Sequence, residues 1–530
     1  MKVIVDKKIP YLQGVIERLA DEVVYAEGRD FTPELVRDAD ALFVRTRTRC
    51  DRALLAGSRV RFIATATIGF DHIDTDFCRA SGITWTNAPG CNAGGVEQYV
   101  ESALLLLERE RGFSLRGACL GVIAVMFFGW RKVSRGFHLT ATWLTAFGAN
   151  LSAWWILVAN SWMQYPVGCD FNLETVRNEM TSFSAVALSP VAVNKFFHTV
   201  TSSFVLAALF VVGVSAWYLL RRREQLMARR SIAIASAFGF VFALVTAFTG
   251  DRSGAIVARV QPMKLAAMEA LYDGQQGAPL TAVGILRPEA QRTGGDAFYF
   301  RIDIPKMLSL MSFRSADAFV PGINDLVYGN EEYGVMPASE KIERGRVAVE
   351  ELGRYRTARE KGDTAAITEI EAKFDRSTPQ GAEFLREHFA YFGYGYLSSP
   401  EQIVPDVPLL FYSFRVMVGA GCFFILLLGL VWWLNRKDRL ADKRWLLWIA
   451  VWSVPLAYLA SQAGWVLAEV GRQPWAIQDL MPVGIAASKI GSTSVTATFF
   501  IFLALFTALL IAELSILFRQ IKIGPEQEKE

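Results

Sequence analysis

The residues best suited to chemistry lie near the ends of long apolar segments. His198 begins one such run, and Met417 lies about three helical turns into another. A histidine and a methionine on different helices can supply both axial ligands of a low-spin heme. Arg415, two residues before Met417, could meet a heme propionate. On residue types alone, a hydrogen-bonded core histidine and a packing methionine are the commoner arrangement, so this pattern indicates a heme site without establishing it.

Three further ionisable residues are candidates because a charged group within or at the edge of a membrane is costly. Glu469 lies at the end of an apolar segment, and Lys264 and Glu269 lie in a short helical stretch of a polar insert. A role as an iron ligand would offset the cost of placing a carboxylate at Glu469. The residue types alone favour a surface pair on a loop helix for Lys264 and Glu269.

The elements that must position these residues are six apolar segments, each long enough to cross about 30 Å of hydrocarbon as a helix. Hydrophobic residues make up 52% of the 530 residues and gather after residue 136. A seventh segment, 118–130, is too short for an unassisted span. The sequence therefore predicts a mainly α-helical polytopic membrane domain over 118–530, with full spans at 137–160, 196–220, 231–250, 408–434, 445–470 and 492–518.

Basic residues give the orientation. The connections 131–136, 221–230 and 436–444 are rich in Arg and Lys, and the rule that positive loops stay inside places them in the cytoplasm. Six spans then put the N-terminal head and the C-terminus in the cytoplasm and the polar insert 251–407 in the periplasm. We expect a bacterial inner-membrane protein surrounded by lipid. A net charge of only +3 gives no reason to expect a nucleic-acid partner.

The first 117 residues have a different pattern, in which short β-branched runs alternate with helical ones. Strands are predicted at 3–5, 23–25, 41–44, 61–64 and 83–85, and helices at 11–21 and 96–108. Such alternation is typical of a parallel sheet with crossover helices. The head is therefore predicted to be a small α/β fragment of flavodoxin-like type, forming a separate domain over 1–117.

Three stretches of the head, 44–47 (VRTR), 64–74 (ATATIGFDHID) and 86–93 (TNAPGCNA), resemble the D-2-hydroxyacid dehydrogenase family, and within it the erythronate-4-phosphate dehydrogenases. The resemblance runs over about 1–122. That family next places a glycine-rich turn that holds the cofactor pyrophosphate, whereas this chain continues from Gly121-Val122-Ile123 without it. We predict no NAD binding and no dehydrogenase activity. An NAD-dependent oxidoreductase assigned from the head is the first alternative function.

Three longer stretches, 160–168 (NSWMQYPVG), 261–269 (QPMKLAAME) and 469–475 (EVGRQPW), resemble subunit I of cytochrome bd quinol oxidases, and the resemblance runs over about 123–522. It implies that the residues at His198 and Met417 bind the low-spin heme b. It further implies that the residue at Glu469 ligates the high-spin heme b. Lys264 and Glu269 would belong to the outer loop that oxidises quinol.

The resemblance implies a respiratory subunit that passes electrons from ubiquinol or menaquinol through heme b toward oxygen, in a complex with subunit II and small subunits. Glu269 would accept a proton released from quinol. The family's first spans, which carry the heme d histidine, have no counterpart here. We therefore expect oxygen reduction to be impaired, and we interpret the change near 122 as a recombination or assembly joint. A membrane protein without redox function is the second alternative, which heme content would distinguish.

Overall fold

The computed structural model describes residues 1–9, 16–18, 20–66, 71–87, 122–123, 125–127, 129, 132–288, 297–488 and 490–525. The chain divides into two compact units, Met1–Ala146 and Phe147–Glu530. The predicted domain boundary at 117 and the helix predicted at 96–108 lie outside the described residues. Of the helix predicted at 11–21, the structure describes one 3₁₀ turn, η1 (Ile16–Arg18).

The N-terminal unit contains a five-stranded parallel sheet in the order β2-β1-β3-β4-β5. Its inner side chains, such as Ile4, Leu42 and Ile63, are fully buried. This strand order is the flavodoxin-like order, and all five predicted strands are confirmed. The strands are β1 (Lys2–Asp6), β2 (Glu22–Ala26), β3 (Ala41–Val44), β4 (Phe62–Thr65) and β5 (Thr84–Thr86), and the described helices are α1 (Pro33–Val36), α2 (Arg52–Leu55) and α3 (Thr75–Ala80).

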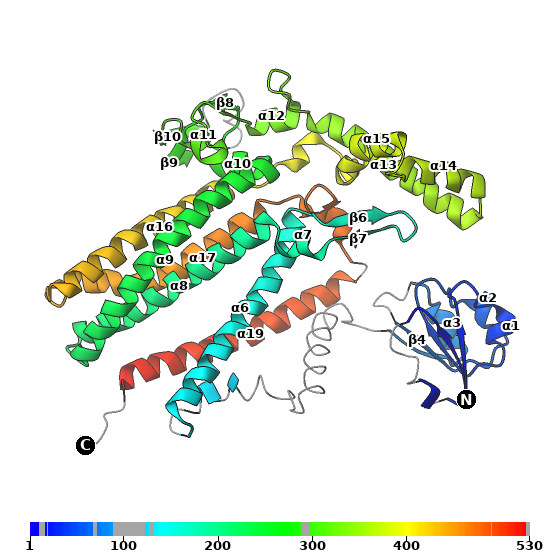
Figure 1. The fold of residues 1–530 in the computed structure, drawn as a ribbon, viewed down its shortest axis with the longest axis horizontal. Coiled ribbons are helices and arrows are strands. Elements are labelled where there is room, and N and C mark those ends of the chain that lie inside the picture. The colour runs from blue at the N-terminus through cyan, green and yellow to red at the C-terminus, as the bar shows by residue number, and fades with distance from the viewer. Residues whose placement is uncertain are drawn as a thin grey trace. The chain divides into compact units, whose positions relative to one another are not determined.

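Long helices dominate the rest of the chain (Figure 1). They are α6 (Arg135–Gln164), α8 (Pro190–Leu220), α9 (Gln225–Val260), α16 (Val407–Arg436), α17 (Arg444–Val470) and α19 (Ser492–Ile523). Within the described part of the chain, five of them are long and apolar enough to cross a membrane, all except α6. The segment 137–160 does form a helix, but its Thr, Asn, Ser and Trp residues lower its hydropathy. The polytopic helical fold class is confirmed, with five rather than six helices meeting this criterion.

Helices α8, α9, α16 and α17 pack together through one apolar core (Figure 1). Leu209, Ile232, Leu428 and Leu447 contribute one fully buried or nearly fully buried side chain from each helix. Small residues allow the close approach: a Cβ added at Gly239 of α9 would lie 2.6 Å from the Cβ of Ala208 on α8. These four helices carry four of the candidate site residues, His198, Arg415, Met417 and Glu469.

The insert folds over one end of these helices (Figure 1). Its elements are α10 (Pro262–Glu269), β8 (Gln275–Gln276), β9 (Leu280–Leu286), β10 (Phe298–Ile304), α11 (Met307–Phe313), β11 (Phe319–Val320), α12 (Ile323–Tyr328), α13 (Ala338–Lys361), α14 (Thr364–Phe374), α15 (Pro379–Glu387), η3 (Phe389–Tyr396) and η4 (Pro400–Ile403). Shorter elements beside it are β6 (Cys169–Asn172), β7 (Arg177–Met180), α7 (Phe183–Ala187), β12 (Trp475–Ile477), β13 (Met481–Pro482) and α18 (Val483–Ala486). Helix α9 continues through 251–260, the first residues of the range predicted as the insert.

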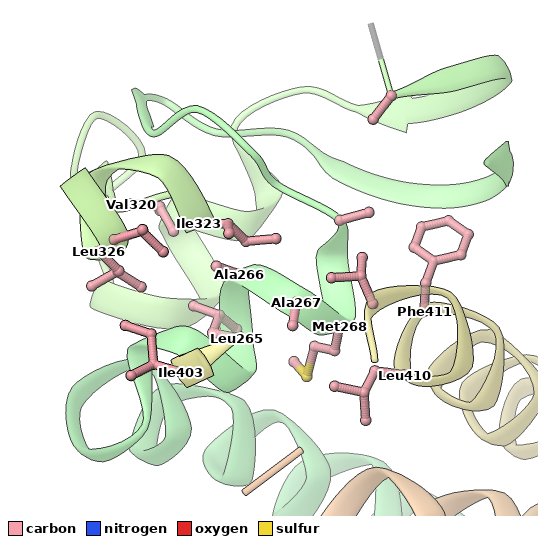
Figure 2. Packing of buried hydrophobic residues seen from close by; sticks show 14 of the residues in the cluster. Leu265, Ala266, Ala267, Met268, Val320, Ile323, Leu326, Ile403, Leu410 and Phe411 are labelled. Atoms are coloured by element: carbon pink, nitrogen blue, oxygen red, sulfur yellow. The ribbon is translucent and has the colours of Figure 1, made fainter. Parts of the chain in front are cut away.

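The core of the insert forms around α10. Figure 2 shows Ala267 and Met268 of α10 beside Leu410 and Phe411 of α16. Leu410 and Phe411 are completely buried in this contact, so the insert packs tightly against the first turns of a membrane helix. This packing brings the ionisable residues of α10 against α16 and α17.

Candidate functional site

The short helix α10 is the centre of the site. Pro262 occupies its first turn, and Ala270, in the left-handed region with φ 50°, ends it. Lys264 and Glu269 are only 5% and 4% exposed. The interpretation of these two residues as a surface pair is therefore wrong. The sequence could not indicate this, because α10 is covered by elements distant in the chain.

Glu269 is held by an arginine from α16. Arg415 Nη2 lies 2.6 Å from Glu269 Oε2 and donates to the carbonyl of Thr281 at 2.8 Å, while Nη1 donates to the carbonyl of Met268. The guanidinium carbon also lies 3.7 Å from the centre of the Phe411 ring. Glu269 Oε1 is buried and has no hydrogen-bond partner among the described residues. Burial raises the pKa of Glu269 to about 7, against the opposing effect of the Arg415 charge.

Lys264 points to a different set of groups. Its Nζ donates to Gln164 Oε1 at 3.4 Å and to the carbonyl of Ala468 at 3.2 Å. Burial lowers the pKa of Lys264 to about 7, and the nearby charge of Lys195 lowers it further. Lys264 and Glu269 thus share a helix and a near-neutral pKa but contact different partners.

Glu469 lies in the last turn of α17, and each of its two carboxylate oxygens has a partner. Arg472 Nη2 lies 2.7 Å from Glu469 Oε2, and Asn160 Nδ2 donates to Oε1 at 2.9 Å. The side-chain oxygen of Asn160 accepts hydrogen bonds from Lys195 and Gln164. A continuous hydrogen-bonded series therefore connects Lys264, through Gln164 and Asn160, to Glu469.

Four members of this series were missed as site residues: Asn160, Gln164, Lys195 and Arg472. Three of them lie inside the stretches 160–168 and 469–475, which were singled out for their resemblance, so the signal was present. The sequence could not predict that the C-terminal ends of α6 and α17 contact each other.

The hydrogen bonds around His198 are compatible with the tautomer that carries its proton on Nδ1. His198 Nδ1 lies 3.0 Å from Thr249 Oγ1 on α9. When the Thr249 hydroxyl donates its single proton to the carbonyl of Val245 or Thr246, its oxygen accepts a hydrogen bond from the N–H of His198 Nδ1. Nε2 then keeps its lone pair, which is the state that a metal-binding imidazole requires.

Glycines lie next to both proposed axial ligands. A Cβ added at Gly250 would lie 3.4 Å from the ring of His198, and a Cβ at Gly464 of α17 would lie 3.0 Å from Met417 Sδ. The described residues contain no group of three or more His, Cys, Asp or Glu placed to hold a bare metal ion. A heme iron, unlike a bare ion, takes only its axial ligands from the protein, and a histidine and a methionine are residue types that can supply them.

A separate cavity of about 790 Å³ lies among the C-terminal ends of α6 and α9, the N-terminal end of α8, the chain around 376–390 and the 478–480 turn. Asp479 lines it and accepts hydrogen bonds from Tyr394 at 3.1 Å and Gln478 at 3.0 Å. Burial raises the pKa of both Asp479 and Tyr394. None of the six predicted site residues is among the residues lining this cavity.

The fold and these groups define a multi-span membrane protein with a buried ionisable site at one end of its helices. Residues 100–525 match the family described as cytochrome bd terminal oxidase subunit I, and the chain belongs to that family. It is 36% identical over 458 residues to cytochrome bd-II ubiquinol oxidase subunit 1 of Escherichia coli, with 84% of each chain covered. A solved structure, the bd oxidase from Geobacillus thermodenitrificans, has the same fold, with a TM-score of 0.57 at 23% identity over 77% of this chain and 75% of that one.

A second similarity covers only part of the chain. Erythronate-4-phosphate dehydrogenase of Bacteroides fragilis is 66% identical over 125 residues, which is 24% of this chain and 36% of that enzyme. The chain therefore spans about a third of the length of this curated dehydrogenase. The predicted combination of the two families in one chain is confirmed.

Proposed function

We propose that the membrane unit oxidises ubiquinol or menaquinol as subunit I of a cytochrome bd-type quinol oxidase and passes the electrons through heme b toward oxygen. One observation carries the proposal. Glu269 is a buried carboxylate with one oxygen held by Arg415 and the other without a partner among the described residues. Its position on an insert attached to the outer end of a membrane helix suits a substrate that arrives from the lipid.

Quinol oxidation releases two protons and two electrons, so the site needs proton acceptors. A catalytic base works best when its pKa lies near the working pH, and the pKa of Glu269 is raised to about 7. In the proposal, Glu269 Oε1 accepts a proton from a quinol hydroxyl while Arg415 keeps the carboxylate in place. Lys264, whose pKa is lowered to about 7, is the second group able to exchange a proton near neutrality.

The electron acceptor is assigned to the other predicted residues. His198 and Met417 would hold the low-spin heme b, and Glu469 the high-spin heme b. Heme, when bound, supplies a one-electron acceptor. Thr249 orients His198 for this role, and each oxygen of Glu469 keeps a lone pair beyond its single hydrogen bond. Contact between Arg415 and a heme propionate stays a prediction, as does impaired oxygen reduction.

The chain is further assigned a place in the membrane and partner subunits. The chain is a multi-pass bacterial membrane protein, and the family functions with a subunit II; small subunits are a further prediction. With the insert 251–407 in the periplasm and both ends in the cytoplasm, protons accepted by Glu269 would leave on the outer side. Lipid would surround the helices, and no nucleic acid takes part.

The test is a reduced-minus-oxidised spectrum of the purified chain, followed by anaerobic addition of quinol. A low-spin heme b band that quinol reduces supports the proposal. A purified, folded chain that contains no heme b would overturn it and would favour the alternative of a membrane protein without redox function.

A further inference from the structure

The hairpin of β9 and β10 exposes an apolar face. Val283 is paired with Ile302, and Ile285 with Phe300, across the antiparallel strands. Directly opposed residues project from the same side of a hairpin. All four side chains are exposed, at 54%, 53%, 55% and 52% respectively. Contiguous apolar surface of this kind marks an interaction site on a soluble or membrane protein.

The opposite face of the hairpin is attached to the proposed quinol site. The carbonyl of Thr281 accepts a hydrogen bond from Arg415. Gly284 lies against the rings of Phe298 and Phe411, where an added Cβ would come within 2.9 to 3.1 Å of the ring atoms. The backbone N–H of Leu286 donates to the hydroxyl of Tyr412 at 3.1 Å. One face of the hairpin therefore packs against α16 beside the proposed quinol site, and the other face is exposed.

The apolar face continues a membrane surface. Helix α16 has 30 residues and a length of about 45 Å, so its first turns lie at the edge of a hydrocarbon layer of about 30 Å. In these turns Leu409, Tyr412 and Val416 are 44%, 43% and 40% exposed. Tyr412 contacts the hairpin directly. The exposed side of α16 thus adjoins the hairpin at Tyr412.

We propose that the face formed by Val283, Ile285, Phe300 and Ile302 is embedded in the outer lipid leaflet. A quinol dissolved in the lipid passes along this face to reach Glu269. The occupant is lipid, because all four side chains are apolar and the face adjoins a spanning helix. Arg287, just past the end of β9, stacks on the ring of Tyr299, and Arg301, paired with Gly284 on the opposite face, stacks on the ring of Phe298. Aromatic and basic side chains of this kind gather at the interfaces of a bilayer. This inference rests on the proposed function.

Photo-crosslinking of the full chain in native membranes tests the contact. Phe300 is replaced by benzoyl-phenylalanine, with Tyr328 of α12, 65% exposed and on another part of the insert, as the matched control position. We expect phospholipid adducts at position 300 and none at 328. Adducts at 300 only with another protein or a second copy of the chain, or no adduct there, would overturn the inference.

A kinetic test separates this inference from the proposed function. Ile302→Ser should raise the KM for a long-tailed quinol about 10-fold, because one apolar contact with the quinol tail is lost, and leave the rate with a short-tailed, water-soluble quinol unchanged. Equal effects on the two quinols, or no effect on either, contradict the inference. If neither quinol reduces the heme of the unsubstituted chain, the proposed function is contradicted, and not only this inference.

Discussion

Arg415 on α16 donates a hydrogen bond of 2.6 Å to Oε2 of Glu269 on α10 and leaves Oε1 of that buried carboxylate without a partner among the described residues. The two residues are 146 positions apart in the sequence. The pair joins the insert to a membrane helix, and in the proposed function Oε1 is the oxygen that accepts a proton.

The rate of quinol oxidation should depend on pH through Glu269. Its pKa is raised to about 7, so the carboxylate that accepts a proton is depleted below pH 7 and abundant above it. The anaerobic rate of heme b reduction by quinol is expected to rise with pH through about 7 and then level off. A rate that falls over this interval would contradict the role of Glu269 as the base.

Thr249→Val should weaken binding of the low-spin heme. The substitution removes the hydroxyl that accepts from His198 Nδ1 and so releases the ring and its tautomer. Loss of such a supporting hydrogen bond commonly costs 10- to 100-fold in metal affinity. The measurement is heme b per protein after purification. Thr199→Val, an exposed neighbour of His198, is the matched control and should retain its heme.

Tyr394→Phe should destabilise the insert. The hydroxyl of Tyr394 donates to the buried carboxylate of Asp479 and ties η3 to the turn after α17. Removing a hydrogen bond to a buried charged group costs roughly 1–3 kcal/mol. A lowered midpoint in thermal unfolding of the detergent-solubilised chain is expected. Tyr328→Phe, on an exposed side chain, should leave the midpoint unchanged, and equal midpoints for both variants would contradict this role of Tyr394.

The purified chain should not oxidise 4-phosphoerythronate with NAD. The described part of the head is a five-stranded sheet, and the chain covers 36% of the dehydrogenase it resembles. NADH production measured at 340 nm checks this, with a complete dehydrogenase as the positive control. Measurable activity that purifies with this chain would show that the head has a function of its own.

Much of the fold was predictable because it depends on local patterns. The β-branched runs predicted all five strands. The lengths of the apolar runs predicted six spans, and five of them form helices long and apolar enough to cross a membrane in the described part of the chain. Helix α6 was harder, because its polar and aromatic residues lower its hydropathy while its length is that of a span. The charged stretch 339–374 forms α13 and α14, separated where Gly362 adopts φ 72°, and one side of α13 is buried.

The sequence singled out Lys264, Glu269 and Glu469, but it predicted neither how they are grouped nor which residues contact them. Lys264 and Glu269 are five residues apart on α10, which places them about 140° apart around a helix. They therefore face different neighbours: Glu269 contacts Arg415, and Lys264 joins the series that leads to Glu469. Contacts between residues more than 100 positions apart depend on the packing of the insert, which no local pattern encodes.

The most direct test of the central claim is anaerobic heme b reduction by quinol in the unsubstituted chain and in Glu269→Gln, with Glu360→Gln on the exposed end of α13 as the control. Loss of a general base typically slows a reaction by about 100- to 10,000-fold. The account predicts a loss of this size for Glu269→Gln, with heme content and spectrum unchanged, and a normal rate for Glu360→Gln. A Glu269→Gln variant that keeps its heme and reduces it at the unsubstituted rate would contradict the account.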